Sequence, residues 1–428
     1  MRLNYEASPM IAVKVRRSFI AGMLIDSVGT GLYMPFALLF FTTVSGLSLA
    51  TVGVGLSVAA LIGVGFSPLS GIAIDRFGAR PVLLGSYAVR MVAFLSFLAV
   101  GNFTGFLIVA TISGIAEKAA FPATLGLISE LVEGRERDRL RALNRSVRNG
   151  GLGIGGLIAA AAIAGGGTTG YLAIAVANAA SFLVAALLLI PVRGTVARQV
   201  ADKDSAGYAT VLRDRPYLAL TGVNVLGGLA FSALGLAIPV YATGTLGVSA
   251  SWIGIVFGVN TAMVSLFGVP LARLAERYRR TRIAALGALL FAASFAVMPL
   301  LGVLDLGGTA LIGALLAIVA LYSLGEILHG QGEGNLAVDS APAALRGRYM
   351  VVHQLSWSAS SVLAPAMFTS LLAWNSAVLW IGLAVAVGAS AGGFLALERR
   401  LPARAVRATG DAPVAARATV RKAVVATA

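Results

Sequence analysis

The stretch Gly71-Ile-Ala-Ile-Asp75-Arg76-Phe-Gly78-Ala-Arg80 separates two long apolar segments and decides how the rest of the chain is interpreted. Charged side chains are costly in the hydrocarbon of a membrane, so the acid and the two arginines must lie at a membrane face. Gly78 supplies the backbone freedom that a tight turn needs. The stretch therefore predicts a short turn between two membrane-spanning helices.

The composition places the whole chain in a lipid environment. Of its 428 residues, 58% are hydrophobic and 12% are charged, whereas soluble domains carry about 25% charged residues. One spanning helix needs about 20 apolar residues. We expect twelve spans, at residues 17–43, 51–74, 81–100, 104–131, 146–165, 170–192, 216–243, 251–275, 282–302, 308–338, 349–373 and 376–397.

The polar residues 193–215 divide the chain into two parts. The spans predict an N-terminal six-helix half at 1–192 and a C-terminal six-helix half at 216–397. Residues 398–428 are basic and lack an apolar run, so we expect a disordered tail that contacts anionic lipid. The expected fold class is an all-α polytopic membrane protein.

Basic residues predict the orientation of the spans. Lysine and arginine are concentrated in the termini and in alternate loops, and the loops between them contain neither residue. The positive-inside rule then predicts that both termini and residues 193–215 are cytoplasmic. The net charge of +15 is explained by this topology, so we expect no nucleic acid partner. The prediction is a monomeric multi-pass protein of a cell membrane, the inner membrane of a bacterium.

An internal repeat relates the two halves. The Gly-Leu-x-x-Pro pattern at residues 31–35 recurs at 235–239, and Asp75-Arg76 corresponds to Glu276-Arg277. At a constant offset of 209 residues, four charged pairs coincide: Glu117 with Glu326, Glu130 with Asp339, Arg137 with Arg346, and Arg139 with Arg348. Such agreement is improbable by chance in a chain with so few charges.

The loop stretch resembles the signature between helices 2 and 3 of major facilitator superfamily transporters, roughly G-x-L-x-D-R-x-G-R-R/K. Ala73 and Ala79 depart from that pattern. The resemblance implies two pseudo-symmetric six-helix bundles with the substrate site between them. It also implies that helices 1, 4, 7 and 10 line a central cavity. The residues that match the gating loop of the family are Gly71, Asp75, Arg76, Gly78 and Arg80.

Ionisable residues within the spans are candidates for function, because a charge there needs a cavity or a partner. Asp26, Glu117 and Glu326 are the candidates for carrying a proton, and Asp26 ranks first because similar exporters often use an acid in helix 1. Polar residues at helical spacing extend these positions into stripes. The candidates for the substrate cavity are Thr30, Tyr33, Ser113, Lys118, Thr124, Tyr322, His329 and Glu333. The alternative is a structural role, in which Lys118 neutralises Asp26 or an acid in the 308–338 span.

The fifth expected span begins with Arg148-Asn-Gly-Gly151-Leu-Gly-Ile-Gly155-Gly156, which is similar to the antiporter motif G-x-x-x-G-P-x-x-G-G of drug-efflux transporters. Gly156 stands where that motif has proline. The alternative is a generic packing face of small residues.

The sequence therefore resembles the drug:proton antiporter branch of the superfamily, and we expect proton-coupled efflux of an amphiphilic small molecule. The alternative is a proton-coupled uptake symporter for a metabolite. Few arginines are expected in the cavity, which favours neutral or cationic cargo. No metal-ligand spacing such as H-E-x-x-H occurs, no nucleophile motif is present, and no cofactor is expected, so the chain is not predicted to be an enzyme.

Overall fold

The computed structural model describes residues 9–132, 134–192, 206–304, 306–342 and 345–407, and these residues form helices and no strand. The helices are α1 (Pro9–Tyr33), the short 3₁₀ helix η1 (Met34–Phe36), α2 (Ala37–Val44), α3 (Leu49–Phe77), α4 (Ala79–Phe97), α5 (Phe103–Leu131), α6 (Gly134–Gly166), α7 (Thr168–Leu189), α8 (Ala206–Arg213), α9 (Arg215–Gly244), α10 (Ser251–Ala275), α11 (Arg280–Val303), α12 (Gly308–Ser340), α13 (Arg346–Trp374), α14 (Ser376–Leu397) and α15 (Ala403–Val406).

Eleven helical segments among the described residues are long and apolar enough to cross a membrane. The first of these segments covers residues 16–44, which include most of α1 together with η1 and α2. Helix α4 is the one expected span that is not among the eleven. Arg80 and Arg90 lower the mean hydropathy of α4, which explains the difference from the expected twelve. The largest shift of an expected boundary is in α6, which begins at Gly134, where we expected the helix to start near residue 146.

Large apolar side chains cover the outside of the bundle. Leu61, Leu266 and Val385 are 59%, 68% and 67% exposed. Such exposure is unfavourable in water, and it is the arrangement that contact with lipid tails favours.

The turn at Gly78 is as tight as the sequence predicted. Gly78 has φ +87°, a conformation that favours glycine, and it separates α3 from α4 as a single residue. Asp75 and Arg76 belong to the last turn of α3. The helix therefore continues through most of the stretch, and only Gly78 forms the connection.

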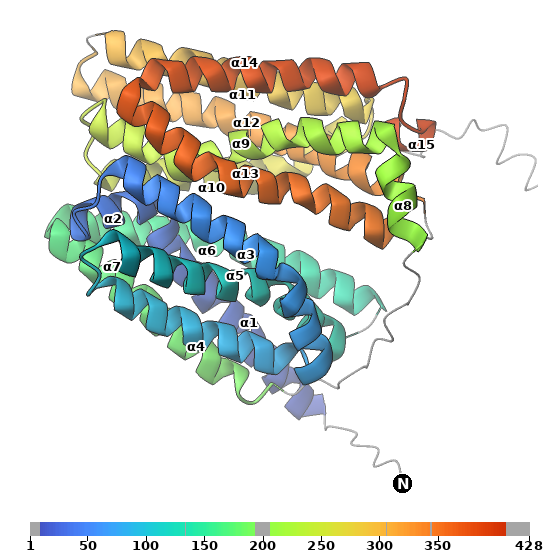
Figure 1. The fold of residues 1–428 in the computed structure, drawn as a ribbon, viewed down its shortest axis with the longest axis horizontal. Coiled ribbons are helices and arrows are strands. Elements are labelled where there is room, and N and C mark those ends of the chain that lie inside the picture. The colour runs from blue at the N-terminus through green and yellow to red at the C-terminus, as the bar shows by residue number, and fades with distance from the viewer. Residues whose placement is uncertain (1–8, 133, 193–205, 305, 343–344, 408–428) are drawn as a thin grey trace, which may run out of the picture.

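Helices α1 to α7 lie together in one bundle and α9 to α14 in the other (Figure 1). Between the bundles, α3 packs on α13 and α6 packs on α10. Counted among the twelve expected spans, α3 and α13 are the second and the eleventh, and α6 and α10 are the fifth and the eighth. The two pairs exchange places when the halves are swapped, as the internal repeat requires.

The contacts between the halves gather toward one end of the bundle. Ser57, near the start of α3, accepts a hydrogen bond from the backbone N–H of Ala366 at 2.9 Å. Gly53 is so close to α13 that an added Cβ would lie 1.8 Å from Oγ1 of Thr369. In the second pair, a Cβ at Gly254 would lie 2.4 Å from the backbone oxygen of Gly156. The halves are thus sealed together at the end opposite to the 71–80 stretch.

The segment that follows the last span is packed where it is described. Leu401 and Val406 are 6% and 5% exposed, and α15 lies against α12 and α11. The rest of the expected tail, 408–428, lies outside the described residues. The expected central loop, 193–215, is described only from residue 206, where it contains α8.

Candidate functional site

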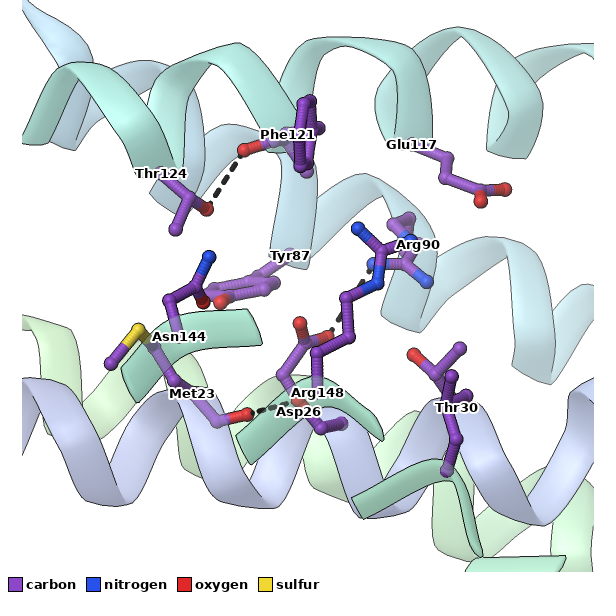
Figure 2. Close-up of a pocket in the computed structure, with 13 residues that line it drawn as sticks. Met23, Asp26, Thr30, Tyr87, Arg90, Glu117, Phe121, Thr124, Asn144 and Arg148 are labelled. Carbon is purple, nitrogen blue, oxygen red and sulfur yellow. Dashed lines mark hydrogen bonds and ion pairs between the residues drawn. The ribbon is translucent and has the colours of Figure 1, made fainter. Parts of the chain in front are cut away.

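A polar pocket lies inside the first half, among α1, α4, α5 and α6 (Figure 2). We call it the polar pocket and define it by its lining residues: Met23, Asp26, Ser27, Thr30, Tyr87, Arg90, Glu117, Ala120, Phe121, Thr124, Asn144, Arg148 and Leu152. Two carboxylates and two guanidinium groups line it, so its formal charge sums to zero when all four groups are ionised.

The central interaction of the pocket is an ion pair between α1 and α4. Nη1 of Arg90 lies 3.5 Å from Oδ1 of Asp26, and the Arg90 guanidinium also lies over the ring of Phe182, 4.1 Å from its centroid. Arg90 is 7% exposed, and its buried Nε has no hydrogen-bond partner. An arginine in such a position depends on Asp26 for neutralisation, because an unpaired buried charge is strongly unfavourable.

A second acid and a second arginine reach the same pocket from other helices. Glu117 comes from α5 and Arg148 from α6 (Figure 2). The Arg148 guanidinium lies 5.6 Å from the centroid of the Phe121 ring. The pocket therefore offers both signs of charge next to an aromatic face. The sequence led us to expect few arginines in the cavity; the polar pocket contains two, and Arg90 is paired with Asp26.

Several predicted site residues meet in the polar pocket and others do not. Asp26, Thr30, Glu117, Thr124 and Arg148 line it together. Ser113 is half-buried and lies outside the lining. Tyr33 packs against aromatic rings, with the Phe94 ring 4.5 Å away.

Lys118 points elsewhere. Its Cγ lies 3.6 Å from the position of a Cβ on Gly63 of α3, whereas Asp26 pairs with Arg90. The basic partner of Asp26 is therefore Arg90 and not Lys118.

The residues of the polar stripe expected along the 308–338 span contact different helices around α12. Tyr322 donates to the backbone oxygen of Ala230 in α9 at 3.1 Å. Glu326 accepts a hydrogen bond from Asn260 of α10 at 2.6 Å. Nδ1 of His329 lies 3.4 Å from the backbone oxygen of Ala284 in α11.

Glu333, the last residue of that stripe, faces α13. Its Oε1 contacts Nε2 of His353, and the two residues are 3% and 4% exposed. His353 was not among the predicted site residues, although it is one of only two histidines in the chain.

The contacts that the structure describes for the residues of the loop stretch lie within the first half. Asp75 and Arg76 are exposed, and Arg76 lies over the neighbouring Phe77 ring. Arg80 donates to the backbone oxygen of Leu189 at 3.3 Å, which ties the start of α4 to the end of α7. A Cβ on Gly71 would meet open space.

The glycines of the predicted antiporter-like motif lie at helix crossings. A Cβ at Gly151 would lie 2.5 Å from the Cβ of Ser27, and one at Gly155 would lie 2.2 Å from the backbone oxygen of Val28. Gly156 faces Gly254 in α10. These positions fit close packing of small residues, within the first half and between the halves.

The predicted site residues did not include three polar lining residues, Ser27, Tyr87 and Asn144, and they did not place Arg90 in the cavity. Arg90 carried a signal, since it is a basic residue inside an apolar span. Ser27, Tyr87 and Asn144 carried none, because their side chains are common at helix ends and in packed interfaces.

A comparison of the sequence with known protein families agrees with the two-bundle fold. Residues 19–365 match the family model described as Major Facilitator Superfamily. The chain belongs to the major facilitator superfamily. The family is one of transporters, and the match covers both halves.

Two curated relatives illustrate the range within this family. The Na(+), Li(+), K(+)/H(+) antiporter of Planococcus maritimus is 23% identical over 83% of this chain and 88% of its own length. The multidrug resistance protein MdtH of Edwardsiella ictaluri is 26% identical over 79% of this chain and 83% of its own length.

Solved structures share the fold. The peptide transporter POT in complex with sulfate superposes with a TM-score of 0.72 at 14% identity, covering 92% of this chain and 96% of that one. The nucleoside transporter NupG gives a TM-score of 0.68 at 13% identity, covering 90% and 98%. At this level of identity the similarity establishes the fold alone.

Proposed function

We propose that this protein is a secondary active exporter that exchanges protons for an amphiphilic small molecule. The observation that carries the proposal is the Asp26–Arg90 ion pair in the polar pocket, 3.5 Å between the charged groups, with Glu117 and Arg148 lining the same pocket. A carboxylate that neutralises an arginine next to a binding pocket can respond to both a proton and a substrate.

The proposed coupling follows from competition for Asp26. When Asp26 is ionised, Arg90 is neutralised and a positively charged or polar group of the substrate can share the carboxylate. When Asp26 takes up a proton, the ion pair is lost, the pocket becomes more positive, and the substrate is released. Such competition between two ligands for one group is a sufficient physical route to exchange.

The direction of transport and the orientation are part of the proposal. The resistance protein MdtH, a relative at 26% identity, supports export. The distribution of basic residues supports cytoplasmic termini. With that orientation, the seal around Ser57 and Ala366 closes the outer side, and the structure corresponds to a state that faces the cytoplasm.

A second candidate function is exchange of a monovalent cation for protons. The antiporter relative, at 23% identity, favours it, and carboxylate oxygens are suitable ligands for a hard cation. In this case Asp26 and Glu117 would bind the cation in place of an organic substrate.

The two functions are distinguished by one set of transport measurements. The purified protein is reconstituted in proteoliposomes with an internal pH indicator, and a panel of cationic, zwitterionic, anionic and neutral amphiphiles is added, followed by Na⁺ and K⁺. Proton movement driven by an amphiphile supports export, and movement driven only by Na⁺ or K⁺ supports cation exchange. Substrate uptake that runs in the same direction as the protons would overturn both proposals in favour of a symporter.

A further inference from the structure

Glu117 and Arg148 carry opposite charges and line the polar pocket without pairing with each other. Within the described part of the chain, Glu117 forms no ion pair, and the Arg148 guanidinium lies over the ring of Phe121, 5.6 Å from its centroid. Their neighbours Asp26 and Arg90 are paired at 3.5 Å. The pocket therefore contains one ion pair and two charges without an ionic partner.

Both of these charges lie at membrane depth. Glu117 is at the middle of α5, and Arg148 lies within the spanning segment 139–166 of α6. Both side chains are exposed, although charged groups at this depth are too costly to face hydrocarbon. Their exposed sides therefore face the pocket and not the lipid (Figure 2). A ligand that enters the pocket meets both of them.

The two charges are offset along α5, with an aromatic ring beside them. Phe121 follows Glu117 by four residues, and residues at this spacing are neighbours on one face of a helix, with about 5–6 Å between their Cβ atoms. Because the Arg148 guanidinium lies over the Phe121 ring, the positive charge lies about one turn along α5 from the Glu117 position. The wall of the pocket thus presents an anion, an aromatic ring and a cation.

The charge balance of the pocket favours a ligand without net charge. The four ionised groups sum to zero. A ligand with a net charge would leave an uncompensated charge in the pocket, which is costly away from bulk water. A ligand with one cationic and one anionic group can pair both of them and keep the balance. Arginine is also well suited to a carboxylate, because its guanidinium can donate two parallel hydrogen bonds.

The acids inside the second half have partners of their own. Glu326 accepts a hydrogen bond from Asn260, and Glu333 contacts His353. Lys118, next to Glu117 in sequence, packs toward Gly63 of α3 and lies outside the pocket lining. The available partners for a charged ligand are therefore Glu117 and Arg148.

We propose that the cargo is an amphiphilic zwitterion. Its cationic group binds Glu117, its anionic group binds Arg148, and its apolar body lies on the Phe121 ring. Asp26 and Arg90 keep their proposed role in proton exchange. This inference rests on the proposed export function and narrows its cargo to one charge class.

Three probes of one shape test the charge class. They are para-(trimethylammoniomethyl)benzoate, which is a zwitterion, its methyl ester, which is a cation, and para-neopentylbenzoate, an anion in which carbon replaces the quaternary nitrogen. Binding of each radiolabelled probe is measured at neutral pH with the full-length protein in lipid nanodiscs. We expect the zwitterion to bind at least about tenfold more tightly than either analogue, because each analogue lacks one charged contact.

Two variants assign the charged contacts. Arg148→Gln should weaken binding of the zwitterion about tenfold and leave the cationic ester unchanged, whereas Glu117→Gln should weaken the zwitterion and leave the anion unchanged. The matched control is Arg145→Gln, which replaces an exposed arginine of α6 outside the pocket lining and should leave all three affinities unchanged. A purely structural role would weaken all probes alike, so equal weakening of zwitterion and ester by Arg148→Gln would contradict the assignment.

The wild-type measurement decides the inference without any variant. Equal or tighter binding of the ester or the anion would overturn it and leave the export proposal intact. If none of the three probes binds, the inference is wrong whatever the transport assay shows. If the zwitterion binds selectively but drives no proton movement in proteoliposomes, the charge class of the site is supported and proton-coupled export is the proposal that fails.

Discussion

The backbone N–H of Ala79, at the start of α4, donates a hydrogen bond to Oε1 of Glu130, near the end of α5, at 3.2 Å. The second half repeats this relationship, since Nη1 of Arg280, at the start of α11, lies 2.5 Å from Oδ2 of Asp339 near the end of α12. Glu130 and Asp339 correspond in the internal repeat. In each half, a carboxylate at the end of one long helix fixes the start of the helix before it, where negative charge is favourable.

The ion pair of the polar pocket gives the first prediction. Asp26→Asn should abolish proton movement driven by the substrate, because the amide cannot take up a proton and no longer neutralises Arg90. Proton flux in proteoliposomes measures this effect. Glu117→Gln and Glu326→Gln, tested in parallel, rank the other candidate carriers.

A matched control for Asp26→Asn is Glu136→Gln. Glu136 also pairs with an arginine, Arg16 at 2.5 Å, but its side chain is 51% exposed and lies outside the pocket. This control should retain coupling. If Asp26→Asn, Glu117→Gln and Glu326→Gln all still couple substrate flux to a pH gradient, the proton is carried by another group.

The loop acid gives the second prediction. Asp75 is exposed in the state described here, and the family resemblance implies that it contacts the start of α13 when the opposite end opens. A carboxylate at a helix start contributes about 0.3–1 kcal/mol, which corresponds to an up to about fivefold change in a two-state equilibrium. Asp75→Asn should therefore slow transport several-fold and leave substrate affinity in the present state unchanged. Unaltered initial rates of transport in the reconstituted variant would contradict the gating role.

The seal between α3 and α13 gives the third prediction. A Cβ at Gly53 would lie 2.6 Å from the backbone oxygen of Pro365, so Gly53→Val must force the two helices apart. Spin labels on cysteines at Gly101 and Ser249, in connections at the sealed end, should report a longer distance between the halves. Gly65→Val is the control, because a Cβ at that position of α3 meets open space. Identical distances in the two variants would show that the seal does not depend on this crossing.

Orientation in the membrane gives the fourth prediction. The chain contains no cysteine, so Ala403→Cys and Ser249→Cys each introduce a single thiol at an exposed position. In intact cells an impermeant thiol reagent should label position 249 and not position 403, because basic residues favour the cytoplasmic side. The opposite labelling pattern would reverse the proposed orientation.

The carboxylate that follows the last span gives the fifth prediction. Glu398 accepts a hydrogen bond from Thr281 at 2.7 Å and pairs with Arg279 and Arg282. The Thr281 hydroxyl and these arginines hold the pKa of Glu398 below its usual value. A lowered folded-state pKa stabilises the protein above the unfolded-state pKa of about 4.3, and this contribution is lost as the pH falls through the folded-state pKa.

Glu398→Gln should therefore reduce stability at neutral pH, by up to about 3 kcal/mol for hydrogen bonds to a charged group. The difference from the wild type should disappear at a pH below the folded-state pKa. Melting temperatures in detergent at the two pH values measure it. Glu136→Gln, which removes an exposed pair, should change stability by at most about 1 kcal/mol, and an equal loss in both variants would argue against a special role of Glu398.

The amino-acid sequence by itself determined the membrane-spanning helices, the turn at Gly78 and the family. Hydrocarbon requires long apolar segments with internal backbone hydrogen bonds, and a one-residue connection with positive φ favours glycine. These constraints act on each segment separately, so they can be recognised in the order of residues. The presence of acids within spans, such as Asp26, was visible for the same reason.

Only the tertiary structure decided which partner each buried polar group meets. Asp26 pairs with Arg90 and not with Lys118, and Glu333 pairs with His353. The partner of a side chain depends on how each helix is rotated and on which helices become its neighbours. In α12 this rotation distributes one polar stripe over α9, α10, α11 and α13, so residues that share a face in sequence are separated by the helices packed around them.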